Sequence, residues 1–146
     1  MTGPPLPDPR QLDKIEDEYW TSDGRIPPET RLLVRGSPAA TEKLLAHADR
    51  QAREFSLRGL NMASISVDLI LPDWPIQRVL QERMVTRGRY STCAVGEIEA
   101  AGFEVLATIA RPHADVVLPE LSIVWAECLA GLLLPVEVPN PFKRRR

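Results

Sequence analysis

The chain has 146 residues, of which 44% are hydrophobic and 26% charged, as in an ordinary globular domain. A domain of this length buries about two-thirds of the surface of its unfolded chain, so a disulfide framework is not needed for stability. The formal net charge of −2 excludes the strongly basic character by which many nucleic-acid-binding domains are recognised.

Two cysteines, Cys93 and Cys128, lie in apolar segments without a nearby Cys or His partner, which predicts buried, reduced thiols and no metal site. The sequence has no basic and apolar leader, and no window approaches the roughly 18 apolar residues of a membrane span. We therefore expect a cytoplasmic protein without membrane association. Only three of the 18 basic residues are lysines, and this bias, with 14 prolines, indicates a GC-rich bacterial genome.

The first 30 residues are rich in proline and in acidic side chains, a composition that predicts an N-terminal arm outside the core. Leu12, Ile15 and Tyr19 have helical spacing, so a short helix of the arm could dock on the domain or on a partner. Packing of the arm on its own domain through Trp20 is the alternative. At the other end, residues 135–146 form a proline-rich tail that closes with four basic residues.

Between these ends, residues 31–134 predict a single domain in which strands and helices alternate. Apolar periodicity predicts a helix capped by Ser37 and stopped by Gly59, and a second helix capped by Asp73. A short helix is expected over residues 96–102, and a last helix before Pro135. We expect its buried stripe to contain Leu121, Val124, Trp125, Cys128, Leu129 and Leu132. Strands are predicted at 31–36, 61–69, 90–95, 103–110 and 114–118, the last two as a hairpin.

This order predicts an α+β fold: a two-layer sandwich with a mixed sheet of about five strands and helices mainly on one face. The strand over 61–69 alternates apolar side chains with Ser64, Ser66 and Asp68. Its second face is therefore expected to be polar or solvated, and open to solvent, to a ligand or to a dimer partner.

One set of residues suggests a catalytic site. Arg35, the Ser64-Ile65-Ser66 triplet and the Glu97-Ile98-Glu99 triplet follow one another in the order of the arginine, Ser-x-Ser and Glu-x-Glu signature, and so the chain resembles the ADP-ribosyltransferases. The resemblance implies that Arg35 holds the phosphates of NAD, that Ser64 and Ser66 shape the nicotinamide pocket, and that Glu99 stabilises the ribose cation. It departs from the family at Ile65, where threonine is usual.

His113, in a turn beside Arg111, is a further catalytic candidate, because histidine titrates near neutrality and could serve as a general base. A turn histidine with satisfied hydrogen bonds is the alternative. The basic tail from Lys143 to Arg146, with Arg87, Arg89 and Arg111, would suit contacts to RNA phosphates.

The sequence does not decide whether the chain is an enzyme. Our leading prediction is a small cytoplasmic bacterial interaction or regulatory domain, one component of a two-gene, toxin–antitoxin-like module. It would bind a protein partner or a second copy of itself through the open sheet face or the N-terminal arm, and would need no cofactor. The alternatives are an NAD-using enzyme and an RNA-associated protein.

Overall fold

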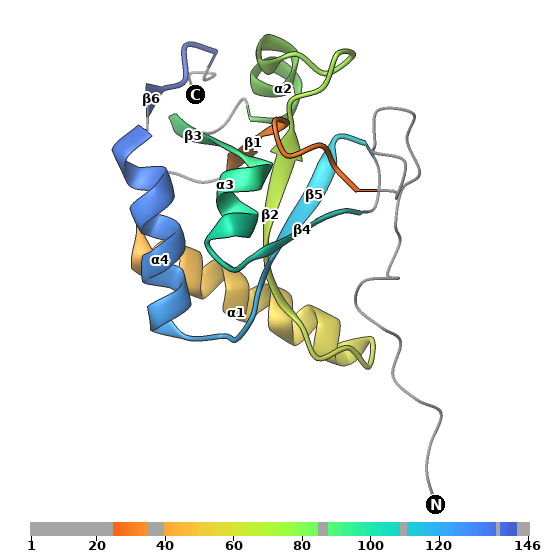
Figure 1. Ribbon diagram of the computed structural model, residues 1–146, viewed down its shortest axis with the longest axis vertical. Helices are drawn as coiled ribbons and strands as arrows, with labels where there is room; N and C mark the ends of the chain where they lie inside the picture. Colours follow the sequence, from red (N-terminus) through yellow and green to blue (C-terminus); the bar gives the residue numbers. More distant parts are fainter. Residues whose placement is uncertain (1–24, 35–39, 85–87, 109–110, 137, 143–146) are drawn as a thin grey trace, which may run out of the picture.

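The computed structural model describes residues 25–34, 40–84, 88–108, 111–136 and 138–142. Within these ranges the strands and helices alternate largely as the sequence predicts (Figure 1). In chain order they are β1 (Arg31–Val34), α1 (Thr41–Leu57), β2 (Ala63–Leu69), α2 (Ile76–Arg83), β3 (Arg89–Ala94), α3 (Val95–Ala100), β4 (Glu104–Ala107), β5 (His113–Leu118), α4 (Ile123–Leu133), a 3-10 turn (Leu134–Val136) and β6 (Val138–Pro139).

All the strands pair in one sheet with the order β4-β5-β2-β1-β3-β6. The α+β fold class is confirmed, but the prediction of a mixed sheet is wrong, because every pair of neighbouring strands is antiparallel. The predicted hairpin is present, with Glu104 opposite Val117 and Ala107 opposite Ala114. The sheet has six strands, not five, because the tail adds β6 beside β3.

The first face of the sheet carries the main hydrophobic core. Ile65 and Val67 of β2 lie opposite Val116 and Ala114 of β5, so all four side chains point to this face. Three helices contribute to the same cluster, through buried residues of α1 (Leu44, Ala48), α3 (Val95, Ile98) and α4 (Ala126, Leu129, Ala130, Leu133).

The fourth helix, α2, packs elsewhere, and Figure 1 shows it at the opposite end of the molecule from α1. Its residues Val79 and Leu80, with Met84, form a separate cluster around Leu33, whose side chain points to the second face of the sheet.

Two predicted helix starts are wrong. Helix α1 begins at Thr41 with Ala40 as its N-cap, while Ser37 lies outside the described residues. Helix α2 has Pro75 as its N-cap, and the Asp73 carboxylate forms an ion pair with Arg111 at 2.7 Å instead of capping the helix. The predicted stop of α1 is confirmed, because Gly59 has a φ of 77° and donates to the carbonyl of Ser56.

The predicted buried stripe of α4 is partly wrong. Val124 is 68% exposed and Cys128 is exposed, whereas Ala126 and Ala130 are buried. Trp125 is half-buried and packs edge-to-face on Phe103, with ring centroids 5.4 Å apart. Helix α4 contacts α1, and its buried side, with Ala126 and Ala130, faces the main core, while Val124 faces outward.

Both ends of the described chain contact the domain. Ile26 is buried in the main core, and the carbonyls of Pro28 and Thr30 accept bonds from the first two amides of α3. Near the C-terminus, Asn140 is buried and donates its side-chain amide to the carbonyl of Met84. No helix in the described ranges is long and apolar enough to cross a membrane.

Candidate functional site

A buried hydrogen-bond network lies on the second face of the sheet, centred on the carboxylate of Asp115 in β5. The hydroxyl of Ser64 in β2 donates to Asp115 Oδ1 at 2.8 Å, and the hydroxyl of Thr108 donates to Oδ2 at 2.6 Å. All three side chains are at most 3% exposed. The strand register places Ser66 opposite Asp115, so Ser64 is its diagonal neighbour and can reach the carboxylate.

His113 extends this network, and its tautomer follows from the partners of Nδ1. Nδ1 lies 3.0 Å from the hydroxyl oxygen of Thr108 and 3.3 Å from the carbonyl oxygen of the same residue. The single hydroxyl proton of Thr108 is already donated to Asp115, and a carbonyl can only accept. Nδ1 therefore carries a proton and donates. This tautomer leaves Nε2 as the basic nitrogen, so the role of His113 depends on the access of a substrate to a side chain that is 7% exposed.

The polar side chains of β2 also have buried or partly buried partners. Gln51 of α1 donates to the hydroxyl of Ser66 at 2.7 Å, and the amide of Ser66 donates to Nε2 of His47 at 3.1 Å. Asp68 is fully buried and accepts from Arg83 at 2.8 Å. The second face at these positions is thus polar, as predicted, but it is not open to solvent.

The network links β2 and β5 to Thr108, the residue after β4, and offers little to a substrate. Ser64, Asp115, Thr108 and His113 are all at most 7% exposed, so their atoms are out of reach of a substrate in this structure. The hydroxyl of Ser64 is directed at a carboxylate and not at the histidine, which is the base that would activate a serine nucleophile.

The residues that resemble the ADP-ribosyltransferase signature do not come together in the described structure. Ser64 lies on the second face, whereas Glu99 lies on α3, which packs on the first face through Val95 and Ile98. Burial raises the pKa of Glu99, with Arg25 opposing the shift and Glu104 adding to it. Arg35 lies outside the described residues.

Glu97 and Arg111 also have structural partners. Glu97 accepts a bond from the thiol of Cys93 at 3.2 Å, and burial, followed by Glu97, raises the pKa of this thiol to about 11. Arg111, which we considered for RNA binding, pairs with Asp73. Among the described residues, no group of three or more His, Cys, Asp or Glu side chains could hold a metal ion.

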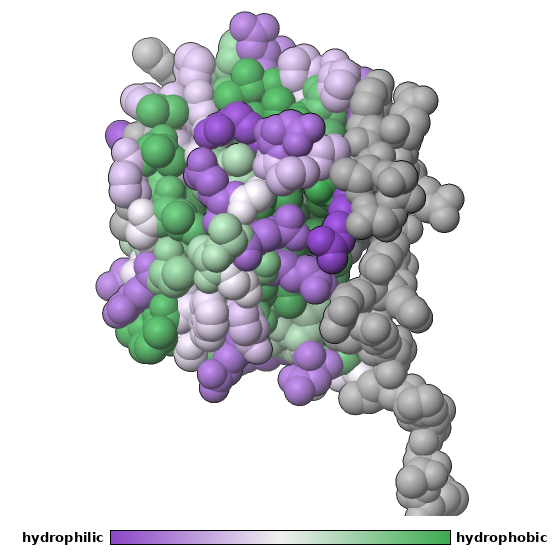
Figure 2. All heavy atoms as spheres, in the orientation of Figure 1, coloured by the Kyte–Doolittle hydropathy of each residue, from purple (hydrophilic) through white to green (hydrophobic). Residues whose placement is uncertain are grey.

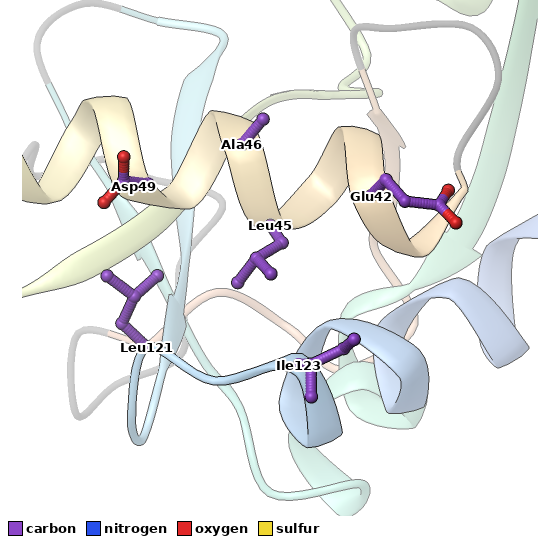
Figure 3. Close-up of a pocket in the computed structure, with 6 residues that line it drawn as sticks. All are labelled: Glu42, Leu45, Ala46, Asp49, Leu121 and Ile123. Carbon is purple, nitrogen blue, oxygen red and sulfur yellow. The ribbon is translucent and has the colours of Figure 1, made fainter.

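The sequence reasoning missed a hollow between α1 and the start of α4 (Figure 3). Its volume is about 420 Å³, and it is lined by Glu42, Leu45, Ala46, Asp49, Leu121 and Ile123. Figure 3 shows Leu45 pointing from α1 toward Leu121 and Ile123, with Glu42 and Asp49 on either side along the helix. Four of the six lining residues are exposed, so the hollow opens onto the surface.

Exposed apolar side chains lie at this hollow and beside it: Leu121 and Ile123 line it, and Val124 follows Ile123 in α4. Leu121 is 38% exposed, Ile123 54% and Val124 68%, and Figure 2 shows hydrophobic side chains at the surface along α4. The signal for this patch is present in the sequence: residues 121–134 contain more apolar side chains than one buried helix stripe can accommodate. No protein-family model, curated protein or solved structure matches the chain.

Proposed function

We propose that this protein is a small protein-binding domain whose partner docks on the hollow between α1 and the start of α4. The supporting observation is the exposure of Leu121 and Ile123 at a concave site whose floor, Leu45, packs against the main core. Val124, the next residue of α4, is also exposed. Clustered exposed apolar residues around a hollow are typical of interaction sites, whereas isolated ones are ordinary surface features.

The free energy gained by burying these three side chains is too small to account for stable binding without further contacts. Full burial of an aliphatic side chain contributes about 1.5–3 kcal/mol, so covering the exposed portions of these three side chains contributes roughly 2–5 kcal/mol. Association costs about 4–15 kcal/mol in lost freedom of motion. The partner must therefore also fill the hollow and contact its rim.

The test is site-specific photocrosslinking in the source organism, with a photoreactive amino acid at Ile123. The control position is Leu57 at the end of α1, which is 84% exposed and does not line the hollow. We expect one discrete crosslinked protein from position 123 and none from position 57. This product should disappear when Val124→Asp is added.

The crosslinked protein is then identified by mass spectrometry and titrated against purified protein. Val124→Asp should weaken binding at least tenfold and leave the melting temperature nearly unchanged, because the side chain is 68% exposed. Leu57→Asp introduces the same charge away from the hollow and should leave binding unchanged. Equal crosslinking from positions 123 and 57, or none from 123, would contradict the proposal.

A further inference from the structure

The helix that forms one wall of the hollow contacts the sheet through a histidine. We infer that His47 is a pH-sensitive contact between α1 and β2: its neutral imidazole holds the middle of α1 on the sheet, and protonation in mild acid releases this contact and alters the hollow. The inference goes beyond the proposed function, because it depends on contacts within the domain and on no partner.

The contact requires a neutral imidazole. The backbone amide of Ser66 donates to Nε2 of His47 at 3.1 Å. An amide N–H can only donate, so Nε2 must offer its lone pair, and in a neutral imidazole the other nitrogen, Nδ1, then carries the proton. A protonated imidazole has N–H groups at both positions and no acceptor. Protonation of His47 therefore breaks this bond and brings two N–H groups face to face.

The place of this bond in the sheet explains why a side chain supplies the acceptor. Amides of alternate residues point to the same neighbouring strand, and the amide of Ile70, directly after β2, donates to a carbonyl of β1. The amide of Ser66, four residues earlier, points to the same side. The described pairing of β1 with β2 ends where Val34 lies opposite Val67, so Ser66 is one residue beyond it. His47 thus takes the place of a strand carbonyl.

Neighbouring contacts of α1 limit the size of the change. Gln51, one turn after His47, donates to the hydroxyl of Ser66 at 2.7 Å, and its amide does not titrate. Leu44 and Ala48, before and after His47 in α1, are buried in the main core. Protonation of His47 therefore loosens one turn of α1 and leaves the helix docked on the sheet.

The same turn of α1 forms the wall of the hollow. Leu45 and Ala46 directly precede His47, Asp49 follows it by two residues, and Figure 3 shows all three on this part of the helix. A loosened turn shifts these side chains relative to Ile123, which lines the hollow from α4. The protonation state of His47 therefore sets the shape of the hollow.

The charged groups of α1 nearest to His47 oppose its protonation. Lys43 and Arg50 lie one turn before and one turn after it, are exposed, and carry the same charge as an imidazolium. Asp49 already has a cationic partner, Arg53, at 2.9 Å. The cations on the helix therefore add to the cost of charging His47.

Carboxylates on the neighbouring elements are bonded or solvated. Asp68 of β2 pairs with Arg83, and Asp115 of β5, opposite Ser66, accepts bonds from two hydroxyl groups. Glu127 of α4, the helix that packs on α1, is exposed, so solvent and salt screen its charge. The loss of the Ser66 amide bond is consequently the main effect of protonating His47.

The first test compares the unmodified chain with His47→Gln in urea unfolding at pH 7.5 and pH 5. Glutamine places an amide oxygen near the position of Nε2, and this oxygen accepts at both pH values. The unfolded chain protonates its histidines below about pH 6.5, whereas folding opposes protonation of His47. This contribution to stability is therefore present above that pH and is lost as the pH falls. Between the two pH values, we expect the unfolding equilibrium constant of the unmodified chain to rise about three- to tenfold more than that of His47→Gln. The other titrating groups, including His113, are common to both chains.

NMR of the unmodified chain tests the contact without depending on the folding of a variant. At pH 7.5 the nitrogen spectrum should show His47 with its proton on Nδ1. At pH 5 the amide of Ser66 should lose at least threefold of its protection from hydrogen exchange, after correction for the intrinsic rate. The amide of Ile70 is the internal control, because its carbonyl acceptor does not titrate. The methyl signals of Leu45 and Ile123 should shift with the same midpoint as His47.

Three results would overturn the inference. These are a proton on Nε2 of His47 at pH 7.5, equal responses to pH of the unmodified chain and His47→Gln, and methyl signals at the hollow that do not follow His47. The experiments contain no partner, so their failure leaves the docking proposal standing, and failure of the photocrosslinking test leaves this inference standing.

Discussion

Replacing Thr108 by valine tests whether the buried network on the second face stabilises the fold. Valine keeps the shape of threonine and removes the hydroxyl that donates to Asp115 at 2.6 Å and accepts from His113 at 3.0 Å. A hydrogen bond to a charged group contributes about 1.5–3 kcal/mol, and Asp115 is too buried for water to replace it readily.

Two smaller effects modify this value. His113 retains the carbonyl of Thr108 as an acceptor at 3.3 Å, so its additional loss is below about 1 kcal/mol. The new methyl group gains at most about 0.8 kcal/mol from burial. The lost bond to the carboxylate is the largest of the three terms, so we expect a net destabilisation of about 2–3 kcal/mol, or roughly 5–10 °C in melting temperature.

The assay is urea unfolding followed by tryptophan fluorescence, with Thr108→Ser as the matched control. Serine keeps the hydroxyl and loses one methyl group, which should cost about 1 kcal/mol. If valine proves as stable as serine or more stable, the network does not contribute the stability that its geometry indicates.

Three further predictions concern single positions. Gly102→Ala should destabilise the folded protein by about 1–2 kcal/mol, because Gly102 has a φ of +110° and an added Cβ would lie 3.0 Å from Trp125. The control is Gly131→Ala, which has open space around its Cβ and should be neutral or stabilising in the same thermal melts. Burial raises the pKa of Glu99 in the folded state, so folding disfavours the charged form, and stability falls as the pH rises above 4.5 through the folded pKa. Glu99→Gln should therefore raise the melting temperature more at pH 7 than at pH 4. An equal effect at both pH values would refute this. At pH 8 a thiol reagent should rapidly modify one equivalent of cysteine, the exposed Cys128, while Cys93, with a pKa of about 11, reacts only on unfolding. Loss of the rapid phase in Cys128→Ser would identify Cys128 as the reactive thiol. Two rapid equivalents would be inconsistent with the structure.

Local patterns predicted most of the elements, because each depends on neighbouring residues. The alternation over residues 61–69 correctly separated the two faces of β2, and the glycines at 59 and 102 marked helix ends. The antiparallel pairing of β1 with β2 was not predictable, because it depends on where α1 crosses and not on the sequence of either strand. Helix α4 was oriented incorrectly for a related reason: a nearly all-apolar helix has no polar face that defines its buried side.

The candidate sites were also not predictable from local sequence, because they combine residues that are distant along the chain. Ser64 was selected as part of the ADP-ribosyltransferase-like signature and His113 as a separate candidate, and only the β2–β5 register reveals that Asp115 and Thr108 bring them into one network. The polar face of β2 was expected to be solvated because its sequence does not indicate that Gln51 and Arg83, from two helices, would reach it. The hollow combines α1 with residues some 75 positions further along the chain, which no local window contains.

The two edges of the sheet constrain how chains can associate. Strand β4 has four residues, and β6 has two, one of which is Pro139 and has no backbone N–H to donate. Short edges interrupted by proline are poor templates for an incoming strand. Strand β3 behind β6 has six residues, of which β6 pairs with only Arg89 and Tyr90, so a chain truncated before Val138 would leave these two residues without that partner strand. Such a truncation lengthens the unpaired edge of β3 and should increase aggregation through strand pairing, which light scattering at rising concentration would detect.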